Sequence, residues 1–178
     1  MKKTLKKGFT LVELVIVIAV IAILSAVLIP TFGNVISNAK KSAAQSEASN
    51  AISQYVTNQA SAGADTNIAD GYVIVLKSRY DVISASDVDD GWKDEIDYVF
   101  VCTNGAVDTN TTVNYNSISS DVYDLEYADS AATVGTGETA TGTIYLDGTT
   151  LTYSGVYLLD YKIDSGKVSA KVILLAKK

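Results

Sequence analysis

A run of 21 residues from Phe9 to Ile29 contains a single charged side chain, Glu13, and is otherwise almost entirely apolar. At a helical rise of about 1.5 Å per residue the run would measure roughly 31 Å, close to the hydrocarbon thickness of a bilayer. Four lysines precede it within the first seven residues, and no basic residue follows before Lys40. The sequence therefore predicts a membrane-spanning helix with a cytoplasmic N-terminus and an external C-terminal part.

Glu13 is the unusual residue of this run, because an acidic group inside a spanning helix normally has a specific partner. Fifteen Phe, Leu, Ile and Val residues share the run. Each favours insertion by roughly 0.3 to 0.6 kcal/mol, against about 2.5 to 3.5 kcal/mol for the carboxylate, so insertion remains favourable. No other charged side chain lies between Lys7 and Lys40. The partner of Glu13 must therefore come from elsewhere.

Cleavage between Gly8 and Phe9 would create such a partner. It would release the lysines and expose a positive α-amine at Phe9, four residues before Glu13 and on the same helical face. The amine and the carboxylate could pair within one chain, or between neighbouring chains staggered by about one turn. The spacing of Phe9 and Glu13 leaves both arrangements open.

The residues around this cut are Gly8-Phe9-Thr10-Leu11-Val12-Glu13-Leu14, after a short lysine-rich leader and before a long apolar helix with Pro30. This arrangement resembles the N-terminal signature of type IV prepilins, over about the first sixty residues. The resemblance implies cleavage after Gly8 by a membrane-embedded prepilin peptidase and N-methylation of Phe9. It also implies polymerisation into a helical filament, and it assigns Glu13 the role of neutralising the Phe9 amine of an adjacent subunit.

Two other interpretations of this N-terminus remain. A secretory signal peptide also has basic residues before an apolar run, but that run is usually 7 to 15 residues long and ends in a small-x-small cleavage site. A plain membrane anchor would not require Gly-Phe-Thr-Leu-x-Glu. The longer run and its acid favour the prepilin interpretation.

Pro30 and Gly33 interrupt the helical pattern just beyond the apolar run, and both weaken a helix. We expect a bend or a locally unwound stretch within residues 22–33, with helix termination at the membrane surface as the alternative. The resemblance favours a continuous helix and gives this pair a part in assembly. Beyond it, apolar residues recur every three or four positions, which predicts an amphipathic helix: Val35, Ile36, Ala39, Ala43, Ala44, Ala48, Ala51, Ile52, Tyr55, Val56 and Ala60.

Beyond Gly63 the pattern changes to short β-branched and aromatic runs separated by turn residues. The expected strands are Tyr72 to Leu76, Tyr98 to Cys102, Thr112 to Tyr115, Val122 to Tyr127, Thr143 to Leu146, Leu151 to Ser154, Val156 to Ile163 and Lys167 to Leu175. The last two should form a hairpin, with Asp164-Ser165-Gly166 as its turn and Tyr157, Leu159, Tyr161 and Ile163 on one face. Asp147-Gly148 marks a second hairpin.

An antiparallel sheet with one apolar face needs a cover, and the alanine-rich stripe is the only long amphipathic element available. The predicted fold is therefore α+β and pilin-like, with a long N-terminal helix packed against a C-terminal antiparallel sheet. The expected organisation is a leader over residues 1–8, a helix over 9–62 and a β-rich domain over 63–178. The helix divides into a transmembrane and polymerisation half, 9–30, and an amphipathic half, 31–62.

Composition excludes several function classes. The chain has no histidine, which removes His-based catalysis and His-ligated metals. Without the four leader lysines, ten basic residues face twenty acidic ones, a net charge of −10. A body of that charge repels phosphate backbones, so no nucleic-acid binding is predicted. We expect no enzymatic activity and no cofactor.

Weaker candidates remain in the C-terminal part. Asp87, Asp89 and Asp90 offer oxygen ligands suited to calcium, but their spacing lacks the third alternating ligand and the terminal Glu of a calcium loop, so a solvated turn is favoured. Cys102 is expected to be a small buried apolar residue. The chain has no second cysteine and so cannot form the disulfide loop common in Gram-negative pilins. This difference favours a Gram-positive source. Asn110 begins a glycosylation sequon.

The sequence and the resemblance together predict a structural subunit of a type IV pilus, first a single-pass membrane protein and then part of an extracellular filament for adhesion, motility or uptake. Its expected partners are copies of itself, the prepilin peptidase, a pilus assembly platform protein, an assembly ATPase and the membrane. One alternative is a pseudopilin of a type II secretion or competence system. Another is a monomeric membrane-anchored module that binds sugars or proteins through its tyrosines.

Overall fold

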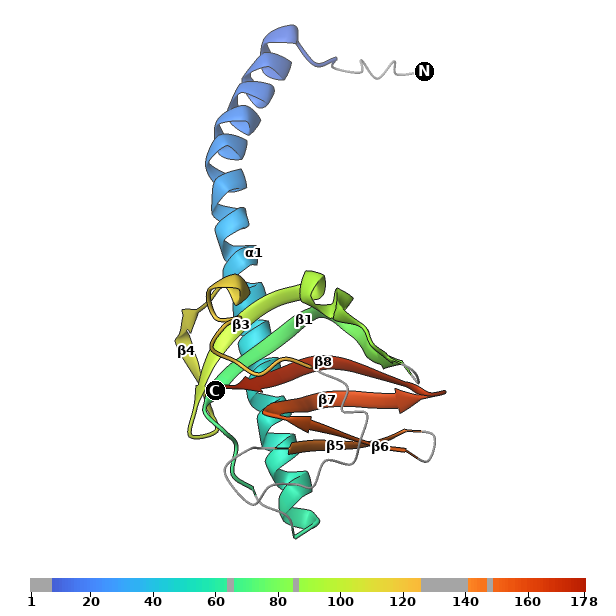
Figure 1. The fold of residues 1–178 in the computed structure, drawn as a ribbon. Coiled ribbons are helices and arrows are strands. Elements are labelled where there is room, and N and C mark those ends of the chain that lie inside the picture. Colours follow the sequence, from blue (N-terminus) through green and yellow to red (C-terminus); the bar gives the residue numbers. More distant parts are fainter. Residues whose placement is uncertain (1–7, 64–65, 85–86, 126–140, 147–148) are drawn as a thin grey trace. The chain divides into compact units, whose positions relative to one another are not determined.

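The computed structural model describes residues 8–63, 66–84, 87–125, 141–146 and 149–178, and of these the side chains of residues 87–88, 109, 141–146 and 149–154 are left undescribed. The chain divides into two compact units, the first ending at Lys41 and the second beginning at Ser42. The first unit is helical, and the second combines helix and sheet (Figure 1).

Helix α1 (Leu11–Ser61) runs without interruption through Pro30 and Gly33. The alternative of helix termination at Pro30 is therefore wrong, and no unwound stretch occurs within residues 22–33. Pro30 has no N–H to donate to the carbonyl four residues earlier, but spanning helices tolerate proline where nearby groups bond the freed carbonyls. Next to the freed Ala26 carbonyl, the Thr31 hydroxyl donates to the Val27 carbonyl at 2.9 Å.

The apolar side chains of the first unit have no cover within that unit. Large hydrophobic residues from Phe9 to Ile36 are 48% to 89% exposed. By length and composition α1 is long and apolar enough to cross a membrane. This segment therefore needs lipid or other protein around it, because so large an exposed apolar surface is unfavourable in water.

The second unit contains a six-stranded antiparallel sheet in the order β4-β3-β1-β8-β7, with β2 paired to β1, and a separate β5-β6 hairpin. The strands are β1 (Gly71–Ser84), β2 (Asp87–Val88), β3 (Ile96–Thr103), β4 (Ala106–Thr112), β5 (Thr141–Leu146), β6 (Thr149–Ser154), β7 (Val156–Asp164) and β8 (Lys167–Ala176). Two short 3-10 helices, η1 (Asp90–Glu95) and η2 (Tyr115–Ser117), lie between strands.

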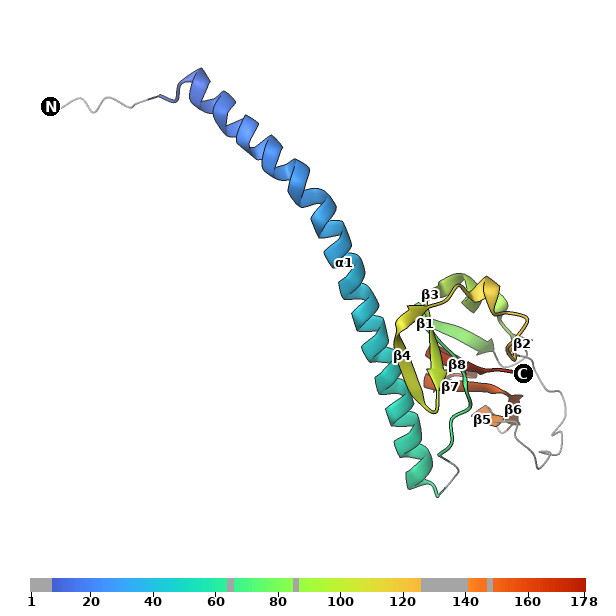
Figure 2. The ribbon, with the colours of Figure 1, turned by 90° about the vertical axis from the view of Figure 1, so that its left-hand side faces the viewer.

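The last turns of α1 cover one face of this sheet, as part of the alanine stripe predicted, whereas Ala43 and Ala60 of that stripe are exposed. Ala44, Ala48, Ala51 and Ile52 are buried there, with Phe100 and other sheet residues in the same cluster. Figure 2 shows this part of α1 lying along the sheet. The small alanine side chains allow the helix backbone to approach the strands closely. The predicted arrangement of a long N-terminal helix on an antiparallel sheet is confirmed.

The opposite face of the sheet is also buried, which the strand pattern did not predict. Trp92 of η1 is fully buried there, with Ile118, Val122 and Leu125 of the segment after η2. The central strands carry nearly continuous apolar runs, such as residues 72–76 and 172–175, and such runs are typical of strands buried on both faces. The expectation of a sheet with one apolar face was therefore wrong.

The β7-β8 hairpin is confirmed, but its alternation is not. Ser165 and Gly166 both have positive φ, 49° and 78°, as a two-residue hairpin turn requires. Register shifts between Leu158 and Tyr161 mark a bulge, and a bulge changes the face on which later residues lie. Tyr157 and Leu159 consequently face α1, whereas Tyr161 and Ile163 pair with Ala170 and Val168 of the opposite core.

Two predicted strands are wrong. The predicted strand from Thr112 to Tyr115 is the end of β4 followed by η2, which the Asn114 side chain caps by accepting from the Asn116 N–H at 3.0 Å. The missed signal is Asn104-Gly105, whose positive φ values of 51° and 72° form the β3-β4 turn.

The predicted strand from Val122 to Tyr127 contains only an isolated bridge between Val122 and Lys177, and its last residues lie outside the described part of the chain. The β5-β6 hairpin is confirmed, although Asp147-Gly148 also lies outside the described residues.

Gly155 combines a left-handed backbone with a close neighbour, so its replacement should destabilise the second unit. Its φ is +67°, and a Cβ there would collide with the ring of Tyr123. Gly155→Ala should lower the free energy of unfolding by about 1 to 2 kcal/mol for the backbone and by about 1 to 3 kcal/mol more for the overlap. Urea unfolding of the full chain in detergent, followed by Trp92 fluorescence, measures this loss.

Gly105→Ala is the matched control, because Gly105 has a similar φ of +72° but open space around the missing Cβ. Gly105→Ala should lower the free energy of unfolding by the backbone contribution alone. Equal losses for the two variants would show that the Tyr123 contact contributes nothing.

Candidate functional site

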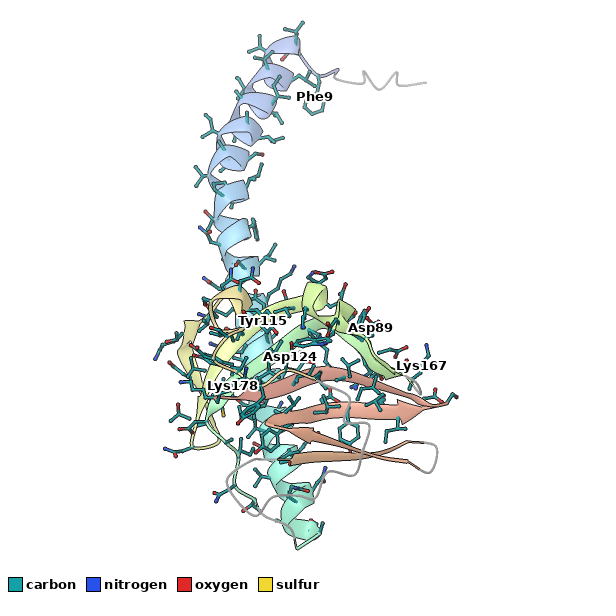
Figure 3. All side chains as sticks on the ribbon, viewed as in Figure 1. Phe9, Asp89, Tyr115, Asp124, Lys167 and Lys178 are labelled. Atoms are coloured by element: carbon teal, nitrogen blue, oxygen red, sulfur yellow. The ribbon has the colours of Figure 1, made fainter. Side chains whose placement is uncertain are left out.

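The predicted functional residues gather at the start of α1. Gly8 and Phe9 precede the helix, and the side chain of Phe9 is 89% exposed at the end that Figure 3 labels. A Cβ added at Gly8 would meet nothing within 4 Å. Among the described residues, therefore, none packs closely against Gly8 or covers the Phe9 side chain.

Glu13 lies in the first turn of α1 and bonds to Thr10, the residue just before the helix. Its Oε2 accepts from the Thr10 main-chain N–H at 2.8 Å and from the Thr10 hydroxyl at 2.7 Å. The Glu13 main-chain N–H donates to the Thr10 Oγ1 at 3.3 Å. This reciprocal pattern is a capping box, in which each side chain bonds the other residue's backbone N–H.

The capping box was missed in the sequence, although its signal was present. A Ser or Thr followed three residues later by Glu, directly before an apolar run, predicts it. Thr10-Leu11-Val12-Glu13 has this form. The box has a consequence for the chemistry, because it holds the carboxylate at the first turn of the helix. A negative charge there also interacts favourably with the positive end of the helix dipole.

Pro30 and Gly33, the other predicted assembly residues, lie in the middle turns of α1, and both are exposed. A Cβ at Gly33 would meet nothing within 4 Å. The structure does not bring this pair near Glu13 along the helix, and its part in assembly stays a prediction.

The aspartates considered for calcium have other partners where their side chains are described. Asp89 accepts from the Gly91 N–H at 2.8 Å and from the Tyr80 hydroxyl at 3.0 Å. Asp90 pairs with Lys93 at 3.3 Å. The side chain of Asp87 is outside the described set, and the calcium alternative stays a prediction. Elsewhere in the described part of the chain, no three His, Cys, Asp or Glu side chains gather as metal ligands would.

Cys102 is buried in the core beneath α1, as expected for a small apolar residue. Burial, with a smaller contribution from the charge of Asp70, raises the pKa of its thiol to about 11. The thiol is therefore protonated at neutral pH, and a protonated buried thiol is a poor nucleophile. Asn110 of the sequon lies exposed on β4.

Comparison with known proteins finds a family model and fimbrial relatives. A family model described as the prokaryotic N-terminal methylation motif matches residues 3–29. The type IV major fimbrial protein FimA of Dichelobacter nodosus is 51% identical over 45 residues, which are 25% of this chain and 29% of that protein. The fimbrial protein EcpC of Eikenella corrodens is 36% identical over 83 residues, 45% of this chain and 54% of that protein.

These alignments cover from less than a third to about half of the relatives' own length. No solved structure matches the chain. The family model covers the segment that contains Gly8, Phe9, Thr10 and Glu13. The methylation motif, the fimbrial relatives and the long apolar helix on an antiparallel sheet together support a similarity of this chain to type IV pilins.

Proposed function

We propose that the chain is cut after Gly8, N-methylated at Phe9 and polymerised through α1 into an extracellular filament. One observation carries this proposal: an apolar helical surface from Phe9 to Ile36 lies open along the first unit, with one carboxylate, Glu13, at its N-terminal end. Such a surface suits a lipid bilayer first and a bundle of like helices afterwards. Pilins are structural subunits, and we propose no enzymatic activity for this one.

The transfer of α1 from lipid to neighbouring helices is roughly neutral for its apolar side chains, because lipid tails are as apolar as leucine. Packing and polar pairs must therefore decide whether subunits associate. A new α-amine at Phe9 adds positive charge to the positive end of the helix dipole, which is unfavourable unless an anion lies nearby. Glu13 of an adjacent subunit supplies that anion and sets the register between the two helices.

The capping box supports this role for Glu13. Both hydrogen bonds from Thr10 go to Oε2, and a carboxylate has acceptor capacity on each of its two oxygens. The carboxylate can thus remain bonded to its own helix while it receives the amine of a neighbour. Thr10 is a positioning residue in this proposal, since it holds Glu13 without contacting the amine.

N-terminal sequencing of the protein isolated from its host tests the processing step. We expect phenylalanine in the first cycle, and mass spectrometry of the N-terminal peptide should show the added methyl group. A chain that still begins with methionine would contradict the proposal. Electron microscopy with an antibody to the second unit should show long surface filaments, whereas a short secretion assembly would show none.

The proposed partners follow from this sequence of events. A prepilin peptidase in the membrane acts at Gly8 and Phe9 on the cytoplasmic side. A platform protein and an assembly ATPase then move subunits from the membrane into the filament, where the second unit of each copy lies outside the helical core.

A further inference from the structure

The second unit has a pocket of about 630 Å³ beside the start of β3, the end of β4 and η2. Its lining includes Asp94, Asp97, Asn114 and Tyr115, and also Lys93. Figure 3 labels Tyr115 and, near it, Asp124 on the neighbouring segment.

The two pocket carboxylates, Asp94 and Asp97, are exposed. Neither side chain forms a hydrogen bond or ion pair with the rest of the described chain. A bulge contributes to this arrangement, because Val75 pairs with Tyr98 and Leu76 with Ile96, which leaves Asp97 as the extra residue of β3. Bulges commonly redirect a side chain at a functional site.

The lysines near the pocket do not neutralise these carboxylates. Lys93 lies 2.8 Å from Asp124 and 3.3 Å from Asp90, and it is bound to both. Burial alone would lower the pKa of the Lys93 ammonium, but its bonds to Asp124 and Asp90 outweigh burial and raise the pKa. Lys77 donates to the main-chain carbonyl of Asp94 at 2.8 Å. The pocket therefore presents net negative charge and disfavours anionic ligands.

Tyr115 adds a second feature that favours a cation. Its ring is half-buried and packs edge-on to Trp92, with 5.8 Å between ring centroids. Burial, together with the charge of Asp124, raises the pKa of the Tyr115 phenol, so the ring stays neutral at physiological pH. A neutral tyrosine ring beside two carboxylates attracts ammonium groups.

A matching pair of cations occurs in the same protein. Between Glu13 and Glu47, α1 carries only two charged residues, the adjacent Lys40 and Lys41. Neither forms a hydrogen bond or an ion pair with any other residue described. In an assembly of identical subunits, two unpaired ammonium groups and two unpaired carboxylates are present in every copy.

We propose that the Asp94–Asp97 pocket of one subunit receives the Lys40–Lys41 pair of a second copy. This inference rests on the proposed function, because it needs copies of the chain to assemble through their helices. Charge complementarity, together with the position of Lys40 and Lys41 on the helix through which copies would assemble, argues for this occupant, and each contact repeats along the filament. The contact would specify which copies are neighbours, as charge pairs at interfaces do.

Cysteine cross-linking tests the contact directly. One copy would carry Lys40→Cys and a co-expressed copy Asp97→Cys, with different mass tags, and filaments would be treated with an added oxidant. We expect a disulfide-linked dimer that contains one chain of each tag. Native Cys102 is buried with a raised pKa and should not contribute. Lys162→Cys, at another exposed lysine, replaces Lys40→Cys in the control and should give no dimer with Asp97→Cys.

Charge reversal gives an independent measurement. Lys40→Glu with Lys41→Glu should reduce filament yield at least about tenfold, because facing like charges oppose association. Asp94→Lys with Asp97→Lys should do the same, and the four changes together should restore filaments. Trp92 fluorescence of the detergent-solubilised chain checks that each variant folds.

The outcomes separate the two proposals. Filaments that form normally but show no mixed dimer would overturn the pocket contact and leave the proposed function standing. Failure of the combined variant to recover, when it is folded, would do the same. A wild-type chain that forms no filament would overturn both.

Discussion

Replacement of Glu13 by alanine is expected to leave the chain inserted in the membrane and cut after Gly8, but to reduce filament yield sharply. Insertion survives because removal of the carboxylate makes the apolar run more favourable in lipid. Assembly fails because the Phe9 amine of the neighbouring subunit would be buried without an anion, and removal of one partner of a buried pair costs about 3 to 5 kcal/mol. Yield is measured from sheared filaments, and cleavage from the mass of the membrane-bound chain.

Glu13→Gln separates the two roles that the structure gives to this residue. A glutamine at this position can still accept from the Thr10 N–H and complete the capping box, but it carries no charge. We expect Glu13→Gln to lose filaments as Glu13→Ala does. Filaments from Glu13→Gln but not from Glu13→Ala would show that capping, not charge neutralisation, is what assembly needs. Normal filaments from both would refute a role for Glu13.

Replacement of Gly8 by arginine is expected to block processing almost completely. The mature form should vanish, and the chain should keep the leader residues that precede Phe9, with a correspondingly higher mass. The chain itself has room for the new side chain, since a Cβ at Gly8 meets nothing within 4 Å. The effect would therefore report recognition by the peptidase. Intact mass measurement of the membrane-bound protein reads it directly.

Thr4→Arg is the control for this variant, because it adds the same charge to the leader without changing the residue at the cut. It should be processed normally. A mature N-terminus at Phe9 in Gly8→Arg would show that the cleavage site lies elsewhere or tolerates a large side chain.

The features of this protein that could be predicted from sequence are those set by local pattern. Three features can be recognised from residues that are close in sequence. They are an apolar run of membrane length, an alanine stripe that repeats every 3.6 residues and a Ser-Gly turn between two strands. These predicted the long helix, its packing against a sheet and the β7-β8 hairpin, which the structure confirms. Two local signals were present but overlooked, the Thr10–Glu13 capping box and the Asn104-Gly105 turn.

Other features depend on contacts between distant parts of the chain. The alternation of β7 was mispredicted because a bulge opposite β8 moves Tyr161 and Ile163 to the other face. The sequence around Trp92 did not indicate that η1 and the segment after η2 would cover the second face of the sheet.

The arrangement of the N-terminal site is thus set by residues that are close in sequence, because a capping box joins two residues three apart at the start of a helix wherever that helix forms. Gly8, Phe9, Thr10 and Glu13 need no other part of the chain to come together. The Asp94–Asp97 pocket is different: it exists only because a bulge in β3, the end of β4 and η2 meet in the folded domain. Such sites depend on strand register and long-range packing, which single-sequence patterns do not specify.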